Sequence, residues 1–512
     1  MKLPYLAPIV TGILIGTSYI PFPPWAIFFC FVPLWIFWLT ETSPKRIFIG
    51  GWFTQFTLTL IGFNWVAYTV HEFGHLPWPI AILALLAFCS FAHLHIPLAG
   101  VAWFYFCRTF KVSETGKIWA LPIFLSLGER LFPMIFQWHL GYTWLWAKFP
   151  AYHLADMIGF LGLSTIGLLL NAFFLAAYLN YQSQKRWLHL IVLPIVFFAA
   201  LNLAGWWRSS NLVTTDAKLN VLIVQANIEN EEKIAAENGS RFRDVVIDRF
   251  IGLTEKALGE VPHPDLVVWP ETAFPDIITD PDLNFGYPAK LREAIRRWNV
   301  KMVTGGYSLL AKTNQITNSF FLLSEAGAWI VPPYHKSILL AFGEYFPLAE
   351  WFPLLREKFP EVGNFGRGPG PTVLTAPGLK IGAQICYESL FDWFTRDLAL
   401  QGAQVIVNLT NDSWYDQRME PFQHGWMTLA RAIESRRPLI RSTNTGISTV
   451  ILANGAILDL SPLHKEWYKL YEVPYATNPP PTPFMGWMFW LIPALLILGL
   501  AYIVWSARRQ IS

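Results

Sequence analysis

Residues 380–388 read KIGAQICYE, an apolar run that ends in a cysteine, a tyrosine and a glutamate. A short apolar run of this kind predicts a buried β-strand. Its cysteine, Cys386, has no second cysteine within residues 208–482, which excludes a disulfide framework in that stretch. On position alone, Cys386 is either an inert core residue or a nucleophile at the end of a strand.

Runs of the same style lie on both sides of this one, at residues 219–227, 264–272, 300–307, 318–324, 403–412, 439–446 and 448–454. Amphipathic stretches at 241–259, 288–298 and 421–437 predict helices between them. Strands that alternate with helices indicate a layered α/β domain. Near-continuous apolar strands indicate a sheet that is covered on both faces.

Several predicted strands end in chemically active side chains. Glu271 follows VVWP, and the pair Asn411 and Asp412 follows VIVNLT. A further candidate, Lys336, lies in YHKSILLAFGEYFP. Layered α/β domains place their sites at the carboxyl ends of strands. Taken singly, Glu271 fits a helix cap as well as a catalytic acid or base. Lys336 likewise fits a solvated surface charge as well as a catalytic amine. Asn411 and Asp412 fit a structural turn better than a catalytic role.

A carboxylate, an amine and a thiol are together sufficient for acyl transfer. The thiol attacks a carbonyl carbon, and the carboxylate takes the thiol proton. The ammonium stabilises the oxyanion of the tetrahedral intermediate. This chemistry requires neither a metal ion nor a cofactor, and we expect none.

The remainder of the sequence has the composition of a membrane protein. Of the 512 residues, 54% are hydrophobic and only 14% are charged, against about 25% charged in soluble domains. Residues 1–207 hold just 10 of the 38 Lys and Arg and 5 of the 35 Asp and Glu. The net charge of +3 gives no electrostatic reason to expect a nucleic-acid partner.

Eight apolar segments are candidates for membrane spans, which need roughly 20 mostly apolar residues. They lie near 5–20, 25–40, 47–70, 79–107, 118–136, 156–182, 187–207 and 486–506. The sequence therefore predicts a multi-pass α-helical membrane protein of eight spans with an inserted water-soluble domain. We expect a seven-helix transmembrane domain at 1–207, the soluble domain at 208–482, and the eighth helix with a short tail at 483–512.

The basic residues between these segments predict the orientation of the chain in the membrane. With eight spans, all basic clusters fall on one side, namely Lys45 and Arg46; Arg108, Lys111 and Lys117; Lys185 and Arg186; and Arg508 and Arg509. Basic loops are retained in the cytoplasm. Both termini are then cytoplasmic, and residues 208–482 face the opposite side, which is the periplasm in a bacterium.

Two charged residues, Glu129 and Arg130, interrupt the fifth apolar segment. Ionisable groups inside a membrane are costly and often functional. A structural ion pair within the helix bundle is an equally good interpretation, and the sequence leaves both open.

Beyond these single residues, several longer strings occur in a characteristic order. They are LGERLFP and WHLGYTW in the apolar part, and VVWPETAFP, HKSILLAFGEYFP, IGAQICYES, NLTNDSWY and PFQHGWMTLARAIESRRPLIRSTNTGIS in the soluble part. Taken together with the topology, they resemble the apolipoprotein N-acyltransferase family of the carbon–nitrogen hydrolase (nitrilase) superfamily.

This resemblance implies a nitrilase-like α-β-β-α sandwich and a role for each matching residue. Glu271 is implied as general base, Cys386 as acylated nucleophile and Lys336 as oxyanion stabiliser. Glu344 is implied as a second carboxylate that supports the lysine. The other implied site residues are Tyr387 and Glu388, which flank the nucleophile, and Trp414, near the substrate entrance, where a membrane-interface anchor is an equal alternative.

The resemblance also implies a two-step reaction in the bacterial inner membrane. Cys386 takes an acyl chain from a phospholipid, with phosphatidylethanolamine as the favoured donor, and forms a thioester. The α-amino group of the diacylglyceryl-cysteine of an apolipoprotein then accepts the chain. The sequence departs from the family pattern at Ile234, Ala341 and Asp416, none of which is one of the three implied catalytic positions.

Two other functions remain in competition. A membrane-tethered amidase would use the same three residues with water as the second nucleophile, although a single span would suffice to tether it. A transporter with a soluble sensor domain would not need Cys386, but the sequence contains no inverted repeat or pair of broken helices to favour it.

Overall fold

The computed structural model describes residues 5–72, 74–210, 215–229, 232, 240–278, 286–341, 343–345, 354, 365–415 and 418–509. Ile234 and Asp416 lie outside the described residues. The chain forms two compact units. The first, here called the helical unit, comprises Met1–Asn211, Arg418–Trp426 and Thr482–Ser512. The second, here called the sheet unit, comprises Leu212–Gln417 and Met427–Pro481.

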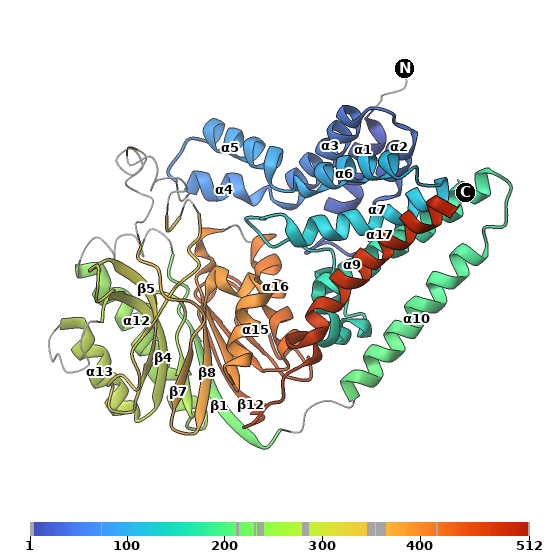
Figure 1. Cartoon of the computed structure of the whole chain (residues 1–512). Helices are drawn as coiled ribbons and strands as arrows, with labels where there is room; N and C mark the ends of the chain where they lie inside the picture. Colours follow the sequence, from blue (N-terminus) through green and yellow to red (C-terminus); the bar gives the residue numbers. More distant parts are fainter. Residues whose placement is uncertain are drawn as a thin grey trace. The chain divides into compact units, whose positions relative to one another are not determined.

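The helical unit consists of apolar helices (Figure 1). They are α1 (Leu6–Gly16), α2 (Val32–Thr40), α3 (Pro44–Gly62), α4 (Trp65–Glu72), α5 (Trp78–Phe91), α6 (His95–Thr109), α7 (Glu114–Leu131), α8 (Tyr142–Trp146), α9 (Ala155–Gln182), α10 (His189–Ser210) and α17 (Leu491–Arg509). Small residues allow close packing between them. A Cβ at Gly12 of α1 would lie 2.5 Å from the Cβ of Thr57 in α3, so only glycine permits this approach.

Four helical stretches of the described chain are long and apolar enough to cross a membrane. They are Trp78–Thr109, Pro150–Gln182, His189–Ser210 and Trp487–Arg509. The third predicted segment is divided into α3 and α4, and the fourth into α5 and α6. Several apolar helices are therefore present, whereas the count of eight spans stays a prediction. Glu129 is buried and Arg130 is half-buried, near the end of α7.

The sheet unit contains two β-sheets. The first has the strand order β12-β1-β2-β4-β5-β6, with β3 paired to β4. Its strands are β1 (Ala217–Gln225), β2 (Leu266–Val268), β3 (Phe274–Ile277), β4 (Lys301–Leu309), β5 (Ile316–Leu323), β6 (Tyr334–His335) and β12 (Trp467–Tyr475). The second has the order β11-β10-β9-β8-β7. Its strands are β7 (Val373–Ala376), β8 (Leu379–Ile385), β9 (Val405–Thr410), β10 (Leu439–Thr443) and β11 (Thr449–Ile451).

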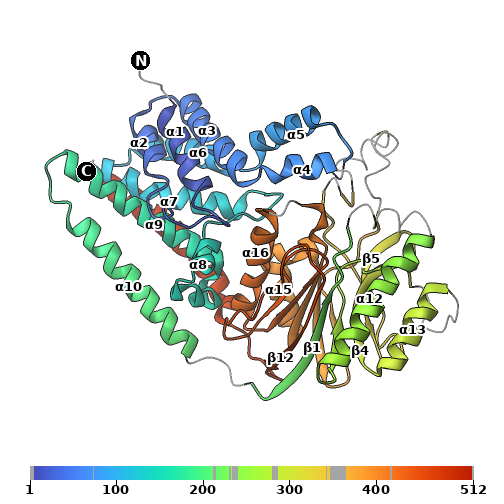
Figure 2. The same ribbon diagram turned by 180° about the vertical axis from the view of Figure 1, so that it is seen from behind.

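Helices cover the outer face of each sheet (Figures 1 and 2). Helices α12 (Ser240–Glu260) and α13 (Gly286–Trp298) pack on the first sheet, and α15 (Asp392–Leu400) packs on the second. Helix α16 begins at Glu420 and ends at Ser435. The layers follow the order helix, sheet, sheet, helix, which is the predicted α-β-β-α sandwich.

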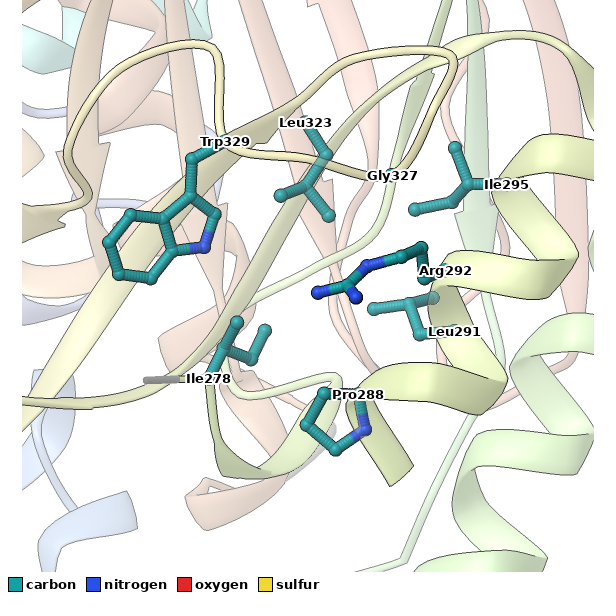
Figure 3. Close-up of a pocket in the computed structure, with 8 residues that line it drawn as sticks. All are labelled: Ile278, Pro288, Leu291, Arg292, Ile295, Leu323, Gly327 and Trp329. Atoms are coloured by element: carbon teal, nitrogen blue, oxygen red, sulfur yellow. The ribbon is translucent and has the colours of Figure 1, made fainter. Parts of the chain in front are cut away.

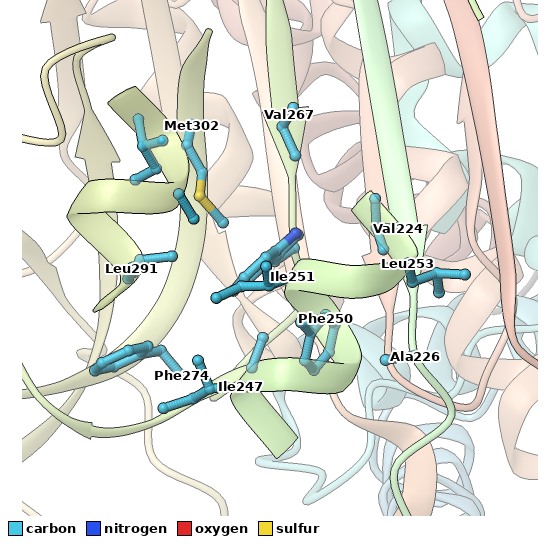
Figure 4. Packing of buried hydrophobic residues seen from close by; sticks show 14 of the residues in the cluster. Val224, Ala226, Ile247, Phe250, Ile251, Leu253, Val267, Phe274, Leu291 and Met302 are labelled. Carbon is cyan, nitrogen blue, oxygen red and sulfur yellow. The ribbon is translucent and has the colours of Figure 1, made fainter. Parts of the chain in front are cut away.

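A continuous hydrophobic core joins α12 and α13 to the first sheet. Figure 4 shows Phe250 and Ile251 of α12 packed among Val224, Val267 and Met302 from the strands. All five side chains are at most 8% exposed. Burial of an apolar side chain of this size contributes about 1.5–3 kcal/mol. This core fixes β2 and β4, and with them the loop that carries Glu271.

Candidate active site

The structure brings the predicted acid and amine side chains into one buried cluster. Nζ of Lys336 lies 3.2 Å from Oε1 of Glu271 and 2.8 Å from Oε1 of Glu344. The three residues are 2%, 6% and 7% exposed. Glu271 lies in the loop after β2, Lys336 directly follows β6, and Glu344 lies in the loop after Lys336. The amine thus lies between the two acids.

Glu271 is held by donors on both carboxylate oxygens. Its Oε1 accepts hydrogen bonds from Lys336 Nζ and, at 2.7 Å, from Nδ2 of Asn318 in β5. Its Oε2 accepts the backbone N–H of Asn411 at 2.8 Å. The loop of Glu271 packs so closely on β4 that a Cβ at Gly305 would lie 2.7 Å from the Cα of Glu271. The orientation of the carboxylate is thus fixed from several strands.

Cys386 is the first residue after β8 and opens a short 3-10 helix, Cys386–Leu390. Its φ is +50°, the left-handed region that non-glycine residues rarely adopt. A sharp strand-to-helix turn of this kind presents the side chain of the turn residue at the strand end. The thiol of Cys386 interacts electrostatically with Glu271 and Lys336.

The electrostatics of the cluster define its resting state. Burial raises the pKa of the Cys386 thiol well above its ordinary value; the Glu271 carboxylate adds to the rise and the Lys336 ammonium opposes it. Burial would lower the pKa of Lys336, but Glu271 and Glu344 outweigh it and raise that pKa well above the ordinary value. The lysine is therefore a stable cation, and the cysteine rests as a protonated thiol.

Glu388 lies two residues after Cys386 and is completely buried. Its Oε1 accepts hydrogen bonds from the hydroxyl of Tyr334 at 2.6 Å and from the N–H of Ser337 at 2.7 Å. Its Oε2 accepts the N–H of Ile385 at 2.9 Å. Burial raises the pKa of Glu388, and the bonds from Tyr334 and Ser337 lower it in part. This side chain joins the cysteine turn to the segment 334–337, which contains the lysine.

The structure also places the two predicted aromatic residues. Tyr387 is buried, and its ring contacts that of Phe391 at a centroid distance of 5.2 Å. Trp414 is half-buried and ends the 3-10 helix Asp412–Trp414. A Cβ at Gly343 would lie 3.7 Å from the Trp414 ring. Trp414 therefore lies next to the loop that carries Glu344.

The sequence did not predict that Asn318 and the backbone of Asn411 contribute to the cluster. Asn318 is an inward-facing residue in the middle of a strand, where the alternation of side chains is the only available signal. Asn411 fits a turn by its residue type, but its backbone N–H bonds Glu271. The following Asp412 forms a fully buried ion pair with Arg441 at 2.9 Å. Ala341, a departure from the family pattern, forms an isolated bridge with Tyr345.

A small pocket elsewhere in the sheet unit is not this site. It lies between α13 and the segment after β5, and Arg292 points into it beside Trp329 (Figure 3). Its cavity volume of about 10 Å³ is enough for about one water molecule. It shares no residue with the charge cluster.

Comparisons with known proteins match both parts of the chain. Residues 220–469 match the carbon–nitrogen hydrolase family, and residues 11–173 match the apolipoprotein N-acyltransferase N-terminal domain. Among solved structures, Nit3 of Saccharomyces cerevisiae, a member of the nitrilase superfamily, is 19% identical with a TM-score of 0.40. That likeness covers 51% of this chain and 91% of Nit3.

Curated relatives align along almost the whole length of the chain. The apolipoprotein N-acyltransferase of Bdellovibrio bacteriovorus is 47% identical, and the alignment covers 96% of this chain and 92% of that relative. The apolipoprotein N-acyltransferase of Geobacter metallireducens is 27% identical, with 90% and 88% covered. Because the identity extends through both the apolar part and the sheet-containing part, the chain belongs to the apolipoprotein N-acyltransferase family, and it is an acyltransferase.

Proposed function

We propose that this protein moves an acyl chain from a phospholipid to the N-terminal amine of a lipoprotein through a thioester on Cys386. The observation that carries the proposal is the buried cluster in which Lys336 contacts both Glu271 and Glu344, beside a cysteine in a strained turn. The donor we expect is phosphatidylethanolamine, and the acceptor is the diacylglyceryl-cysteine of an apolipoprotein.

In the first step, Glu271 takes the proton of the Cys386 thiol, and the sulfur attacks the ester carbonyl of the phospholipid. Lys336 stabilises the oxyanion of the tetrahedral intermediate. The bond between the carbonyl carbon and the glycerol oxygen then breaks. Glu271 returns its proton to that oxygen, and a lysophospholipid leaves. The raised pKa of the thiol supports this order, because a thiol that rests protonated requires a base.

In the second step, the lipoprotein amine attacks the thioester carbonyl, and Lys336 again stabilises the oxyanion. Glu271 takes a proton from the attacking nitrogen as the carbon–sulfur bond breaks. The proton passes to the Cys386 sulfur, which restores the thiol. The products are an amide on the lipoprotein and the resting enzyme, with no net change in protons on the protein.

We further propose that the chain crosses the bacterial inner membrane eight times, with the catalytic domain in the periplasm. The support is the placement of the basic clusters, which an eight-span count puts on one side. A reporter fused after residue 482 should behave as periplasmic and one fused at residue 512 as cytoplasmic. The reverse pattern would refute both the span count and the orientation.

The main test of the function is the intact mass of the protein purified from membranes. An acyl adduct on Cys386 that disappears when an amine-bearing diacyl lipopeptide is added is the expected result. An amidase would instead lose its adduct to water at the same rate with or without the amine. The Cys386→Ala variant is the control, because it retains the other three cysteines and should carry no adduct.

A further inference from the structure

Asn318 lies inside the charge cluster but has no part in the two steps above. Its side chain is 4% exposed, and its Nδ2 lies 2.7 Å from Oε1 of Glu271 and 3.2 Å from Oε1 of Glu344. Its backbone carbonyl accepts the N–H of Lys336 at 2.9 Å. One residue of β5 therefore contacts both acids and the backbone of the lysine.

The amide of Asn318 is oriented for the two carboxylates. Among the described residues, its buried Oδ1 has no hydrogen-bond partner. An amide turned by 180° would place Oδ1 against two carboxylate oxygens, which is repulsive, and would remove both donated bonds. In the observed orientation, Oδ1 accepts no hydrogen bond from a described residue, whereas Nδ2 donates to both Glu271 and Glu344.

The neighbouring side chains of β5 serve a different cluster. The hydroxyls of Thr317 and Ser319 each lie 3.0 Å from Nδ1 of His335 and also contact Ser308. Successive side chains of a strand point to opposite faces. Asn318 is consequently directed to the face of the charge cluster, whereas Thr317 and Ser319 are directed away from it.

The charges of Glu271, Glu344 and Lys336 indicate what the amide of Asn318 does between them. Two buried carboxylates contact one ammonium, so these ion pairs hold one more carboxylate than cation. A primary amide has two N–H donors and does not titrate, so it can bond to one oxygen of each acid without adding charge. Hydrogen bonds to an ionised carboxylate favour its ionised form.

We propose that Asn318 is a positioning residue that holds Glu271 in the ionised, correctly oriented form needed for proton abstraction. This inference rests on the proposed function, because it takes Glu271 as the base. The titratable groups that face Glu271 are Lys336, Glu344 and Cys386, and Asp412 acts electrostatically on the thiol. Asn318 acts on Glu271 and does not itself contact the reacting atoms.

The test is the pH dependence of Cys386 acylation, measured as single-turnover adduct formation by intact mass with mixed micelles of detergent and phosphatidylethanolamine as donor. Asn318→Leu removes both donors and keeps the same number of side-chain heavy atoms. The acid limb of its rate profile should lie about one to two pH units higher than in the unaltered protein. Above that limb, the variant should react nearly as fast as the unaltered protein. Asn318→Ser keeps a single donor and should give a smaller upward shift.

The matched control is Ser319→Ala, which removes a buried hydrogen bond from the next residue of the same strand but points away from the cluster. It should leave the acid limb where it is in the unaltered protein. Thermal unfolding of each variant shows whether it is folded. An unmoved limb in a folded Asn318→Leu variant, or in Asn318→Ser if the leucine variant does not fold, would overturn the inference.

The same assay separates this inference from the proposed function. If Glu271→Gln acylates Cys386 normally, Glu271 is not the base, and the proposed function fails whatever Asn318 does. If Glu271→Gln blocks acylation while the Asn318 variants keep the original limb, the proposed base stands and only the role of Asn318 is wrong.

Discussion

Oε1 of Glu388 accepts the hydroxyl hydrogen of Tyr334 at a distance of 2.6 Å, and both side chains are buried. Glu388 belongs to the turn that begins at Cys386, and Tyr334 belongs to the two-residue strand β6 that precedes Lys336. The same carboxylate bonds the N–H groups of Ser337 and Ile338. A single side chain thus sets the position of the lysine segment relative to the nucleophile turn.

We predict that Glu388→Gln lowers both stability and activity. The amide nitrogen of glutamine meets groups that are themselves donors, so at least one buried bond to a charged acceptor is lost, at a cost of about 1.5–3 kcal/mol in the free energy of unfolding. Tyr334→Phe removes only one donor and should be milder in both measurements. Thermal unfolding of the detergent-solubilised protein and single-turnover acylation give the two readouts. An equal defect in both variants would contradict a positioning role for the carboxylate.

The second prediction concerns the nucleophile. Cys386→Ser should abolish the covalent acyl adduct and N-acylation while leaving thermal unfolding close to that of the unaltered protein. A serine hydroxyl is a far weaker nucleophile than a thiol beside a carboxylate base. Cys107→Ser, in helix α6 of the helical unit, is the control for loss of a buried thiol and should retain the adduct. Normal N-acylation by Cys386→Ser would refute the assignment.

The third prediction follows from the raised pKa of Cys386. An ordinary thiol is half ionised near pH 8.5, whereas Cys386 stays protonated there because burial and Glu271 disfavour the thiolate. Its alkylation by iodoacetamide should keep rising with pH beyond about 9.5, where the rate for an ordinary thiol has levelled off. Peptide mapping distinguishes Cys386 from the other three cysteines. A rate that levels off near neutral pH would show a preformed thiolate instead.

Removing the cation extends this test. Lys336 opposes the rise of the thiol pKa, so Lys336→Met should move the alkylation profile to still higher pH. Methionine keeps much of the length and volume of the side chain. A profile that moves to lower pH would mean that the ammonium does not act on the thiol.

The apolar runs of the sequence predicted most strands of the sheet unit, and each wrong prediction has a local physical cause. The strand expected at 380–388 is β8 at Leu379–Ile385, and it ends directly before Cys386. The run expected at 264–272 is shorter, because Pro270 has no N–H for a sheet ladder and the chain turns there before β3. Strand β12 was missed because its alternation of tyrosines with charged residues and its Pro474 are typical of an edge strand.

The positions of charged groups at a site depend on contacts between distant strands, which a single sequence shows only in part. Glu271 and Cys386 were expected together because both follow predicted strands. Lys336 was added to them because an amine completes the chemistry of acyl transfer and because the family resemblance implies it. Asn318 occupies a strand interior, and its role emerges only when β5 is paired with β6. Similarly, hydropathy predicted the apolar stretch at 79–107, which the structure has as Trp78–Thr109, but an average over residues does not register the turn at 92–94 between α5 and α6.

The final prediction distinguishes the contribution of Lys336, the proposed oxyanion stabiliser, from that of Glu344. Loss of one oxyanion donor typically costs about 10²–10³ in rate, so Lys336→Ala should slow acylation of Cys386 by that factor. Lys336→Arg keeps the charge, but its longer planar head does not fit between two carboxylates that lie 2.8 and 3.2 Å from Nζ. We therefore expect little rescue by arginine.

Glu344 should contribute mainly through the lysine. Its Oε1 accepts from Lys336 Nζ and its Oε2 accepts the N–H of Leu340 at 2.9 Å, so it fixes the ammonium to the loop that follows β6. Glu344→Gln should then give a milder form of the Lys336→Ala defect. Since the pair acts as a unit, the double variant should be little slower than Lys336→Ala alone in single-turnover acylation. Rate losses that multiply in the double variant would show that Glu344 works independently of the lysine.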